Sequence, residues 1–380
     1  MLRRDRHSIS RSCGRGLWLL FVLLVTRSAS AQNRASESLP APAGKLTFGT
    51  ASDELSGGWV PLGSVPVDQA GAGRRVYVLP GEDSEVTAGG SNQFSIHAVA
   101  ANNFFHEQNS EFLVSQRYET HTIGLDYRRG FNVRGFPRFE IGGQVQLHES
   151  DSGVLNGFIL GVESFWVSVT GGEQPRTQDA TRPPLGTLIV RNGSPIYREG
   201  GGGSGFGDVY ASAKIALLDG APSSKAARVS ARIGINVAGS SSFSEGNFVG
   251  AGLSLDQKLL ERVAVHGDVR ATRALDETSV WNLSLRRWAF GFSVGPEFRL
   301  ARNTSLNLQI DGSSTPYWPT GTFAFDKGYG DITFGLGHRF KAGSRIVTAQ
   351  LYMRENMNLP FSVRWNTDPD LSVGLKVRIH

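Results

Sequence analysis

Apolar and polar side chains alternate in one segment after another, from about residue 92 to the end of the chain. In residues 371–379, apolar side chains take every odd position, and Ser, Gly, Lys and Arg take the even ones. A period of two puts neighbouring side chains on opposite faces, so each segment predicts a β-strand with one apolar and one wet face. Twelve segments show the pattern: residues 92–104, 116–127, 138–148, 208–217, 227–237, 248–256, 263–271, 288–300, 305–311, 331–340, 345–353 and 370–379.

The connections between these strands differ in length on the two sides of the predicted sheet. Those after the even strands are short, as in residues 258–261, 301–304 and 341–344, whereas those after the odd strands are about as long or longer, up to residues 149–207. Outer-membrane barrels have short turns at one rim and long loops at the other, and a soluble sandwich has no reason to sort its loops. We therefore predict an all-β fold, an antiparallel transmembrane β-barrel of about 12 strands over residues 92–380, with about 10 or about 14 strands as open alternatives.

Residues 1–31 have the composition of a secretory signal peptide. A basic stretch precedes the apolar run Leu17–Val25, and Ala29 and Ala31 form a small-residue cleavage pattern. We expect cleavage after Ala31, export through the periplasm and insertion into the cell outer membrane. The alternative is an uncleaved anchor, but the run is much shorter than the roughly 20 residues that span a bilayer as a helix.

The signal peptide also accounts for the basic balance of the whole chain. It holds six of the 39 Lys and Arg residues and one of the 34 Asp and Glu residues, so the mature chain has no formal net charge. Charge therefore gives no support for a nucleic-acid partner. The partners that we expect are outer-membrane lipids, the barrel-assembly machinery and a small-molecule solute.

Two segments depart from the alternation. Residues 32–91 are rich in Pro, Gly, Ser and Ala, and we predict a mostly irregular periplasmic lead-in, with partial folding into the barrel mouth as an option. Residues 154–166 show helical spacing of apolar side chains, which predicts a short helix in the longest extracellular loop. A lid, a plug and an interfacial helix remain open as its role, and packing on the rim is the simplest use.

The polar faces of the strands would line the barrel interior. On this register ten basic and six acidic side chains point inward, so we expect a modest positive excess that favours anions, with Arg228 and Arg232 as its best candidates. The lumen-facing candidates are Glu140, Lys214, Arg228, Arg232, His266, Asp268 and Arg270.

Motifs for enzymatic chemistry are weak. The glycine run 200–207 has neither a preceding strand nor a following helix, and the histidines lack metal-ligand spacing, so we expect no cofactor and no metal site. His266 and Asp268 share a strand face and could orient one another in a hydrolase. Inward polar residues occur in every such barrel, however, so a structural role for the pair is favoured.

Several stretches resemble a family of proteobacterial outer-membrane proteins known as domain of unknown function 3187. The resemblance covers most of the chain from residue 92 and implies an outer-membrane barrel without an assigned activity. The opening Gly205-Phe206-Gly207-Asp208 is also similar to barrels associated with phenol degradation, so a neighbouring family is an alternative. The similar stretches are residues 111–113, 118–120, 205–214, 328–335, 354–356 and 367–375.

The functional hypothesis follows from the predicted strand number. About twelve strands lie between about eight, whose interior is filled by side chains, and about sixteen, which leave an aqueous channel. We therefore expect a narrow or plugged conduit, or a binding barrel, for a small molecule. A membrane-embedded lipid-modifying enzyme and a structural or assembly barrel with a closed lumen are the alternatives.

The export hypothesis predicts the first residue of the mature protein. Protein recovered from outer-membrane fractions should give an N-terminal sequence that begins at Gln32, because the signal peptide is removed after Ala31. Cytosolic protein that retains Met1 would contradict both export and the membrane barrel.

Overall fold

The computed structural model describes residues 59–65, 79–151, 168, 186–200, 202–221, 224–239, 244, 246–279, 281–326, 328–356 and 371–380. Within these ranges, no helix has the length and apolarity needed to cross a membrane. The predicted helix at 154–166 lies outside the described residues. In the connection between two later strands, the four-residue helix α4 (Phe323–Asp326) was not expected from the sequence.

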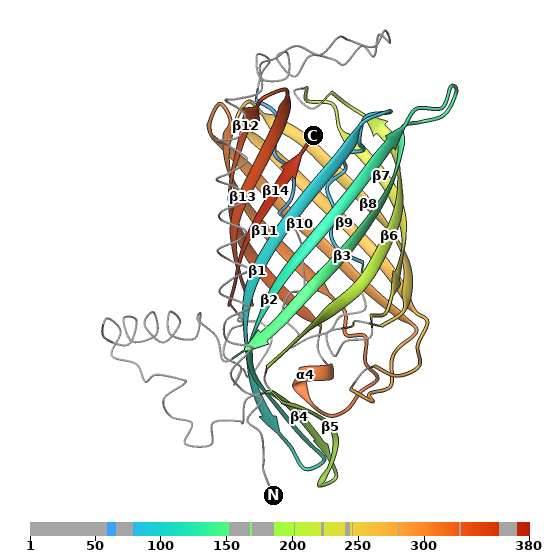
Figure 1. Cartoon of the computed structure of the whole chain (residues 1–380), viewed down its shortest axis with the longest axis vertical. Coiled ribbons are helices and arrows are strands. Elements are labelled where there is room, and N and C mark those ends of the chain that lie inside the picture. Colours follow the sequence, from blue (N-terminus) through green and yellow to red (C-terminus); the bar gives the residue numbers. More distant parts are fainter. Residues whose placement is uncertain are drawn as a thin grey trace, which may run out of the picture. The chain divides into compact units, whose positions relative to one another are not determined.

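Twelve strands form a closed antiparallel ring, as the alternation predicts (Figure 1). Each strand pairs with its neighbours in the chain, and the first also pairs with the last. Since each backbone N–H and C=O along the ring can then find a partner in an adjacent strand, this closure suits a sheet inside a bilayer. The strands are β1 (Asn92–Gln108), β2 (Phe112–Phe131), β3 (Phe139–Asp151), β6 (Gly203–Asp219), β7 (Arg228–Val237), β8 (Phe248–Leu260), β9 (Val263–Ala274), β10 (Trp288–Ala301), β11 (Thr304–Ser313), β12 (Tyr329–Ala342), β13 (Arg345–Asn356) and β14 (Leu371–Ile379).

The faces of these strands are the reverse of those in a soluble protein. On β10, Phe290 and Phe292 are 57% and 45% exposed, whereas Ser293 and Glu297, farther along on the opposite face, are buried. Strand β9 repeats the arrangement, with exposed Val269 between buried charged residues. Apolar side chains outside and polar ones inside are what a lipid-embedded barrel requires.

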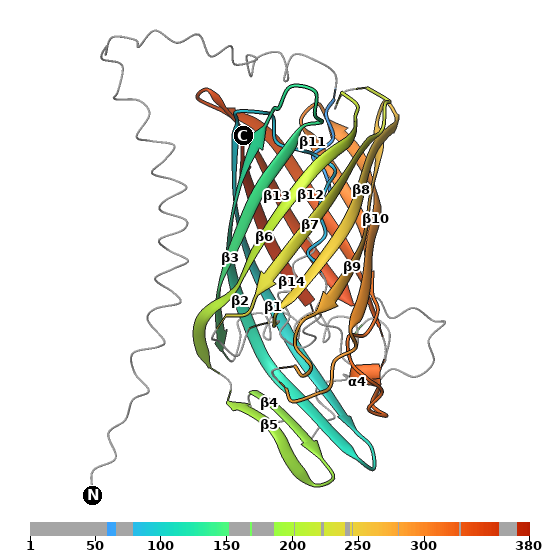
Figure 2. The ribbon, with the colours of Figure 1, turned by 90° about the vertical axis from the view of Figure 1, so that its right-hand side faces the viewer.

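One hairpin of the barrel extends past its neighbours at the end where the long loops lie. The pairing of β1 with β14 stops at Ala101, but β1 and β2 remain paired as far as Gln108 and Leu113. A second hairpin, made of β4 (Gly186–Arg191) and β5 (Ser194–Gly200), adds to the free side of the extension. Figures 1 and 2 show this four-stranded projection beyond the ring. The sequence did not predict β4 and β5.

The described parts of the predicted periplasmic lead-in lie inside the barrel. Residues 59–65 and 79–91 are mostly irregular, as expected, and hydrogen bonds link them to inward-facing side chains of the wall. Figure 2 shows these residues in blue within the ring of strands. These residues therefore lie within the barrel and not in the predicted periplasmic lead-in, which agrees with the option of folding into the barrel. The polar inner face satisfies backbone groups that an irregular segment leaves unpaired.

The ring predicts different labelling at its two ends. A cysteine in place of Ser194, which is exposed at the start of β5, should react with an impermeant maleimide on intact cells. The matched Ser344→Cys variant, exposed in the turn between β12 and β13, should react only after the outer membrane is broken. The mature chain has no cysteine of its own, so the background is low. The reverse labelling pattern would invert the orientation of the barrel.

Candidate functional site

The residues that fill the barrel interior form two legs of one segment. We call residues 59–65 the first leg, residues 79–91 the return leg, and both together the inner segment. The return leg continues directly into β1, so the inner segment is tethered to the wall at Asn92.

The first leg follows β11 from the short-turn end of the barrel toward its middle. The indole Nε1 of Trp59 donates to Ser305 Oγ at 3.1 Å. Further in, Val65 uses its backbone N–H and C=O to bond the side-chain amide of Gln309, at 3.1 and 3.2 Å. A primary amide offers both a donor and an acceptor, so Gln309 serves this leg as a neighbouring strand would.

Two glycines on the inner face of β12 make room for the first leg. A Cβ atom at Gly337 would lie 2.4 Å from Leu62 Cδ1, and one at Gly335 would lie 2.7 Å from Val65 Cγ2. Such distances are below van der Waals contact, so the side chains of the leg occupy the space that the glycines leave. The inner face of the wall is therefore complementary in shape to the first leg, in addition to forming hydrogen bonds with it.

The return leg carries an acidic segment, residues 82–85, into a group of wall cations. The Glu82 carboxylate lies 2.8 Å from Arg128 Nη1, 3.1 Å from Lys214 Nζ and 3.0 Å from Arg232 Nη1. These cations come from β2, β6 and β7, and in the ring β3 lies between β2 and β6. Charges in such a poorly hydrated interior need partners, and Glu82 supplies one to all three strands at once.

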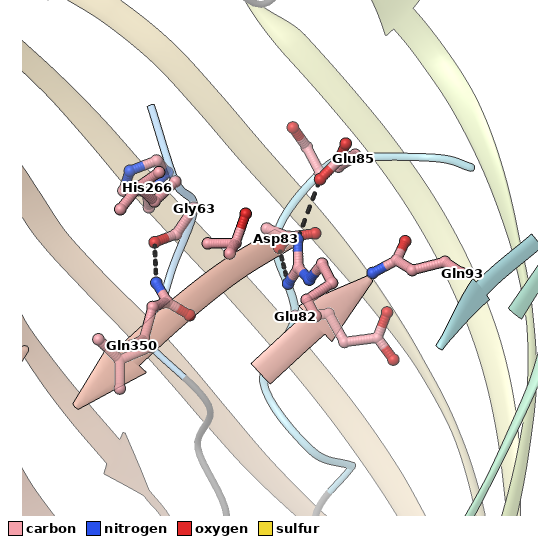
Figure 3. Close-up of polar contacts among 12 residues, drawn as sticks. Gly63, Glu82, Asp83, Glu85, Gln93, His266 and Gln350 are labelled. Atoms are coloured by element: carbon pink, nitrogen blue, oxygen red, sulfur yellow. Dashed lines mark hydrogen bonds and ion pairs between the residues drawn. The ribbon is translucent and has the colours of Figure 1, made fainter. Parts of the chain in front are cut away.

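The next carboxylates of the acidic segment reach the last strand. Arg378 on β14 donates from Nη2 to Asp83 at 2.8 Å and from Nη1 to Glu85 at 3.0 Å. The dashed lines at Asp83 and Glu85 in Figure 3 mark these contacts. Asp83 also approaches Lys214 Nζ at 4.0 Å. The acidic segment thus ties β14 to strands on the other side of the β1–β14 seam.

A second polar group binds both legs. His266 lies between two carboxylates, with Nδ1 2.7 Å from Asp256 and Nε2 2.8 Å from Glu297. Asp256 accepts the backbone N–H of Ser84 on the return leg at 2.9 Å. Glu297 accepts the backbone N–H groups of Leu62 and Gly63 on the first leg. We call Asp256, His266 and Glu297 the anchor group, because these three side chains from β8, β9 and β10 hold the two legs together.

The structure places all seven lumen-facing candidates on the buried inner face. Glu140 lies 3.1 Å from Lys214 and also accepts the backbone N–H of Thr87. Arg228 contacts Asp256 of the anchor group at 3.4 Å. The remaining candidates, Arg232, Asp268, Arg270 and His266, lie on β7 and β9.

The suggested pairing of His266 with Asp268 is not what the structure shows. His266 contacts the carboxylates of Asp256 and Glu297, while Asp268 lies 3.2 Å from Arg232 and 2.7 Å from Arg270. The two side chains share a strand face but serve different neighbours. An Asp268–His266 dyad for hydrolysis is therefore replaced by two separate sets of ion pairs.

The expected positive excess is also corrected. Among the described residues, the interior holds five buried acids, and one buried base, Lys258, that the sequence register left out. Two of the acids belong to the inner segment, which was not placed in the lumen. Arg228 and Arg232, the expected anion-selective pair, both contact carboxylates. The acids missing from the earlier count are Glu82, Asp83, Glu119, Asp256 and Asp331.

The sequence did contain one signal for the acidic segment. Three acids stand within residues 82–85, immediately before the first strand, in a lead-in otherwise rich in small and apolar residues. Two inward glycines on β12, on an otherwise polar face, were a separate signal for the first leg. Neither pattern has a period, so neither could show which residues it contacts in the closed barrel.

An apolar cluster lies at the long-loop end of the lumen, and we call it the aromatic cap. Trp281 stacks on Tyr317 with ring centroids 6.2 Å apart and packs against Phe325 of α4 at 5.8 Å. Leu79, the first described residue of the return leg, belongs to the same buried cluster. The inner segment is therefore in contact with the outer loops as well as with the wall.

Comparison with known proteins identifies the fold. No family model and no curated protein matches the chain. Among solved structures, the COG4313 outer membrane channel from Pseudomonas putida F1 aligns with a TM-score of 0.52 and 13% identity, over 78% of this chain and 98% of that chain. The NanC porin aligns with a TM-score of 0.39 and 8% identity, over 76% of this chain and 99% of that chain. The first of these similarities shows that the chain has the fold of an outer-membrane channel.

The anchor group predicts a large difference between two histidines. His266→Gln removes the group that lies between two buried carboxylates, and the free energy of unfolding should fall by about 3–5 kcal/mol. The matched His338→Gln variant alters an exposed histidine that contacts Thr304 Oγ1 at 2.9 Å, and should change it by less than about 0.5 kcal/mol. Urea unfolding of protein refolded into phospholipid vesicles measures both. Equal losses in the two variants would show that the anchor group does not stabilise the barrel.

Proposed function

We propose that this protein is a conduit for a small molecule across the cell outer membrane, and that the inner segment is its displaceable plug. The observation that carries the proposal is the kind of bond that holds the plug. Backbone groups of Leu62, Gly63, Val65, Ser84 and Thr87 bond to side chains of the wall.

Bonds of this kind can break independently of the bonds that close the barrel. The strands of the ring are held to one another by their own backbone ladder. Gly90 and Ser91 make backbone bonds with Gly130 of β2 and stay with the wall. Contacts with wall side chains can break while the ladder stays closed, so the part of the inner segment before Gly89 can leave the lumen without unfolding the barrel. A structural barrel with a permanently closed lumen would need no such separation.

The path through the barrel also favours a gated conduit over an open pore. The first leg fills the side of β11 and β12, the acidic segment fills the side of β2, β6 and β7, and the aromatic cap lies at the far end. A solute therefore meets the plug wherever it enters. Twelve strands leave a lumen narrow enough for one segment to fill, and wide enough for a small molecule once it is displaced.

The same proposal covers the cellular setting. The signal-peptide pattern of residues 1–31 supports export with cleavage after Ala31, and the apolar outer face supports contact with outer-membrane lipids. Assembly by the barrel-assembly machinery and membership of the family of domain of unknown function 3187 belong to the proposal, on the sequence motifs given above.

Two variants that loosen the plug by different means should open the conduit. Glu82→Gln with Asp83→Asn removes charges from buried ion pairs, and removal of one partner costs about 3–5 kcal/mol. That loss is enough to shift a closed-to-open ratio by about a hundredfold or more. Gly130→Ala would place a Cβ 2.2 Å from the backbone oxygen of Thr87, so the return leg must move. Single-channel recordings in planar bilayers should show longer or larger openings in both variants than in the wild type.

Each variant has a matched control. Glu111→Gln removes an exposed carboxylate that contacts Arg191 on the projection. Gly143→Ala adds a Cβ whose nearest neighbour is at 3.6 Å, an ordinary contact. Both controls should record like the wild type. If neither plug variant conducts although both are inserted and folded, the barrel is closed by something other than the inner segment and the conduit proposal fails.

A further inference from the structure

We propose that the wall cations around the acidic segment form a binding site for a small solute that carries two or more carboxylate groups. The inner segment occupies this site with its own carboxylates when the barrel is closed. The inference rests on the proposed function, since a solute reaches the site only when the segment is displaced.

The first half of the site is the group of cations around Glu82. Three N–H donors lie within 3.1 Å of this one carboxylate, from Arg128 on β2, Lys214 on β6 and Arg232 on β7. With the acidic segment in place, the side chains of Lys214 and Arg232 are at most 1% exposed. Convergent, desolvated cations are the arrangement that recognises a carboxylate most strongly.

The second half of the site accepts a neighbouring carboxylate. Arg378 binds Asp83 at 2.8 Å, and Lys214 lies within 4.0 Å of carboxylate oxygens of both Glu82 and Asp83. One ammonium group therefore contacts two carboxylates, which sets a short spacing between them. A solute with carboxylates a few bonds apart can reproduce this pair, whereas a monocarboxylate satisfies half of it.

Local charge shows why the site needs an anion. The connected wall residues comprise five cations, Arg128, Lys214, Arg232, Arg270 and Arg378, and three carboxylates, Asp126, Glu140 and Asp268. The acidic segment covers this excess of two charges with three carboxylates, Glu82, Asp83 and Glu85, of which Asp83 and Glu85 share Arg378. Once the segment leaves, two buried positive charges lose their partners, which is costly in a low-dielectric interior. An anionic solute removes that cost, so solute binding and plug release favour one another.

The acidic segment leaves donors of the wall unused. Arg232 Nη1 is 3.0 Å from Glu82 as an ion pair, but it is not aligned for a hydrogen bond. In the part of the chain that the structure describes, Nε of Arg232 and Nε of Arg378 also find no hydrogen-bond acceptor. A free solute can orient its carboxylates toward these groups in a way that a segment tied at Asn92 cannot. The tethered carboxylates are therefore replaceable.

Competition between segment and solute gives the test. Propane-1,2,3-tricarboxylate is titrated into the refolded full-length mature protein, and its dissociation constant is measured by isothermal titration calorimetry. The wild type should bind weakly, because its apparent affinity is reduced by the small fraction of molecules with a displaced segment. Glu82→Gln with Asp83→Asn should bind about tenfold more tightly or better, since that fraction rises. Gly130→Ala, which moves the segment without changing a charge, should shift the affinity in the same direction.

Three further measurements fix the chemistry. Both further substitutions are made in the Glu82→Gln, Asp83→Asn variant. Arg232→Gln should abolish tricarboxylate binding, whereas Arg191→Gln, which alters an exposed arginine of the projection, should not. Inorganic phosphate should compete weakly, because a single tetrahedral anion cannot span both halves of the site. The uncharged propane-1,2,3-triol should give no heat. Equal affinity for phosphate would make the site a general anion site and overturn the assignment to carboxylates.

The outcomes separate this inference from the conduit proposal. Loosened variants that conduct but bind no tricarboxylate would leave the conduit standing and refute the carboxylate site. Variants that bind tricarboxylate and never conduct would support the carboxylate site and refute the conduit, since the barrel would then bind the solute without transporting it. Equal tricarboxylate affinity in the wild type and in both loosened variants would show that segment and solute do not compete, which refutes the inference directly.

Discussion

Charges inside the barrel have to be neutralised there, because the inward side chains that carry them are buried from solvent. The strands meet this requirement only in part. Four strands each supply a cation that forms an ion pair with a carboxylate of the segment before the first strand. These cations are Arg128, Lys214, Arg232 and Arg378. The position of the inner segment, the connection across the seam and the chemistry of the lumen all depend on this pairing.

Two kinds of bond distinguish the wall of the barrel from the inner segment that we propose is displaceable. Strand-to-strand backbone bonds run around the whole ring, and each supports its neighbours. The inner segment before Gly89 is bonded instead through side-chain carboxylates and amides of the wall, such as Glu297 and Gln309, and its last residues join the backbone of Gly130. The backbone bonds between strands can be lost only by opening the barrel. The side-chain bonds to the inner segment can be exchanged for other polar partners. The fold thus combines a stable barrel wall with an inner segment whose bonds can be exchanged.

The sequence predicted the ring well and its contents poorly, for physical reasons. Alternation is a local property, so the twelve strands and their faces could be found residue by residue. The contact between Glu82 and Arg232 joins positions with no shared period, and only the closed ring brings them together. The same holds for Asp256 and Glu297, which reach His266 from the strands on either side. Strand β4 was missed because its partner is the part of β2 that extends past the ring.

The seam between β1 and β14 has a consequence for how the molecule is built. It joins the two ends of the ring, so a sheet that grows by consecutive hairpins closes there. Arg378 stands on the closing strand and holds Asp83 and Glu85, while Asn92 begins the strand that it closes against. On such a route, sealing the wall and enclosing the segment would be one event in assembly. The filling does not have to be threaded into a finished cylinder, because the cylinder is completed around it.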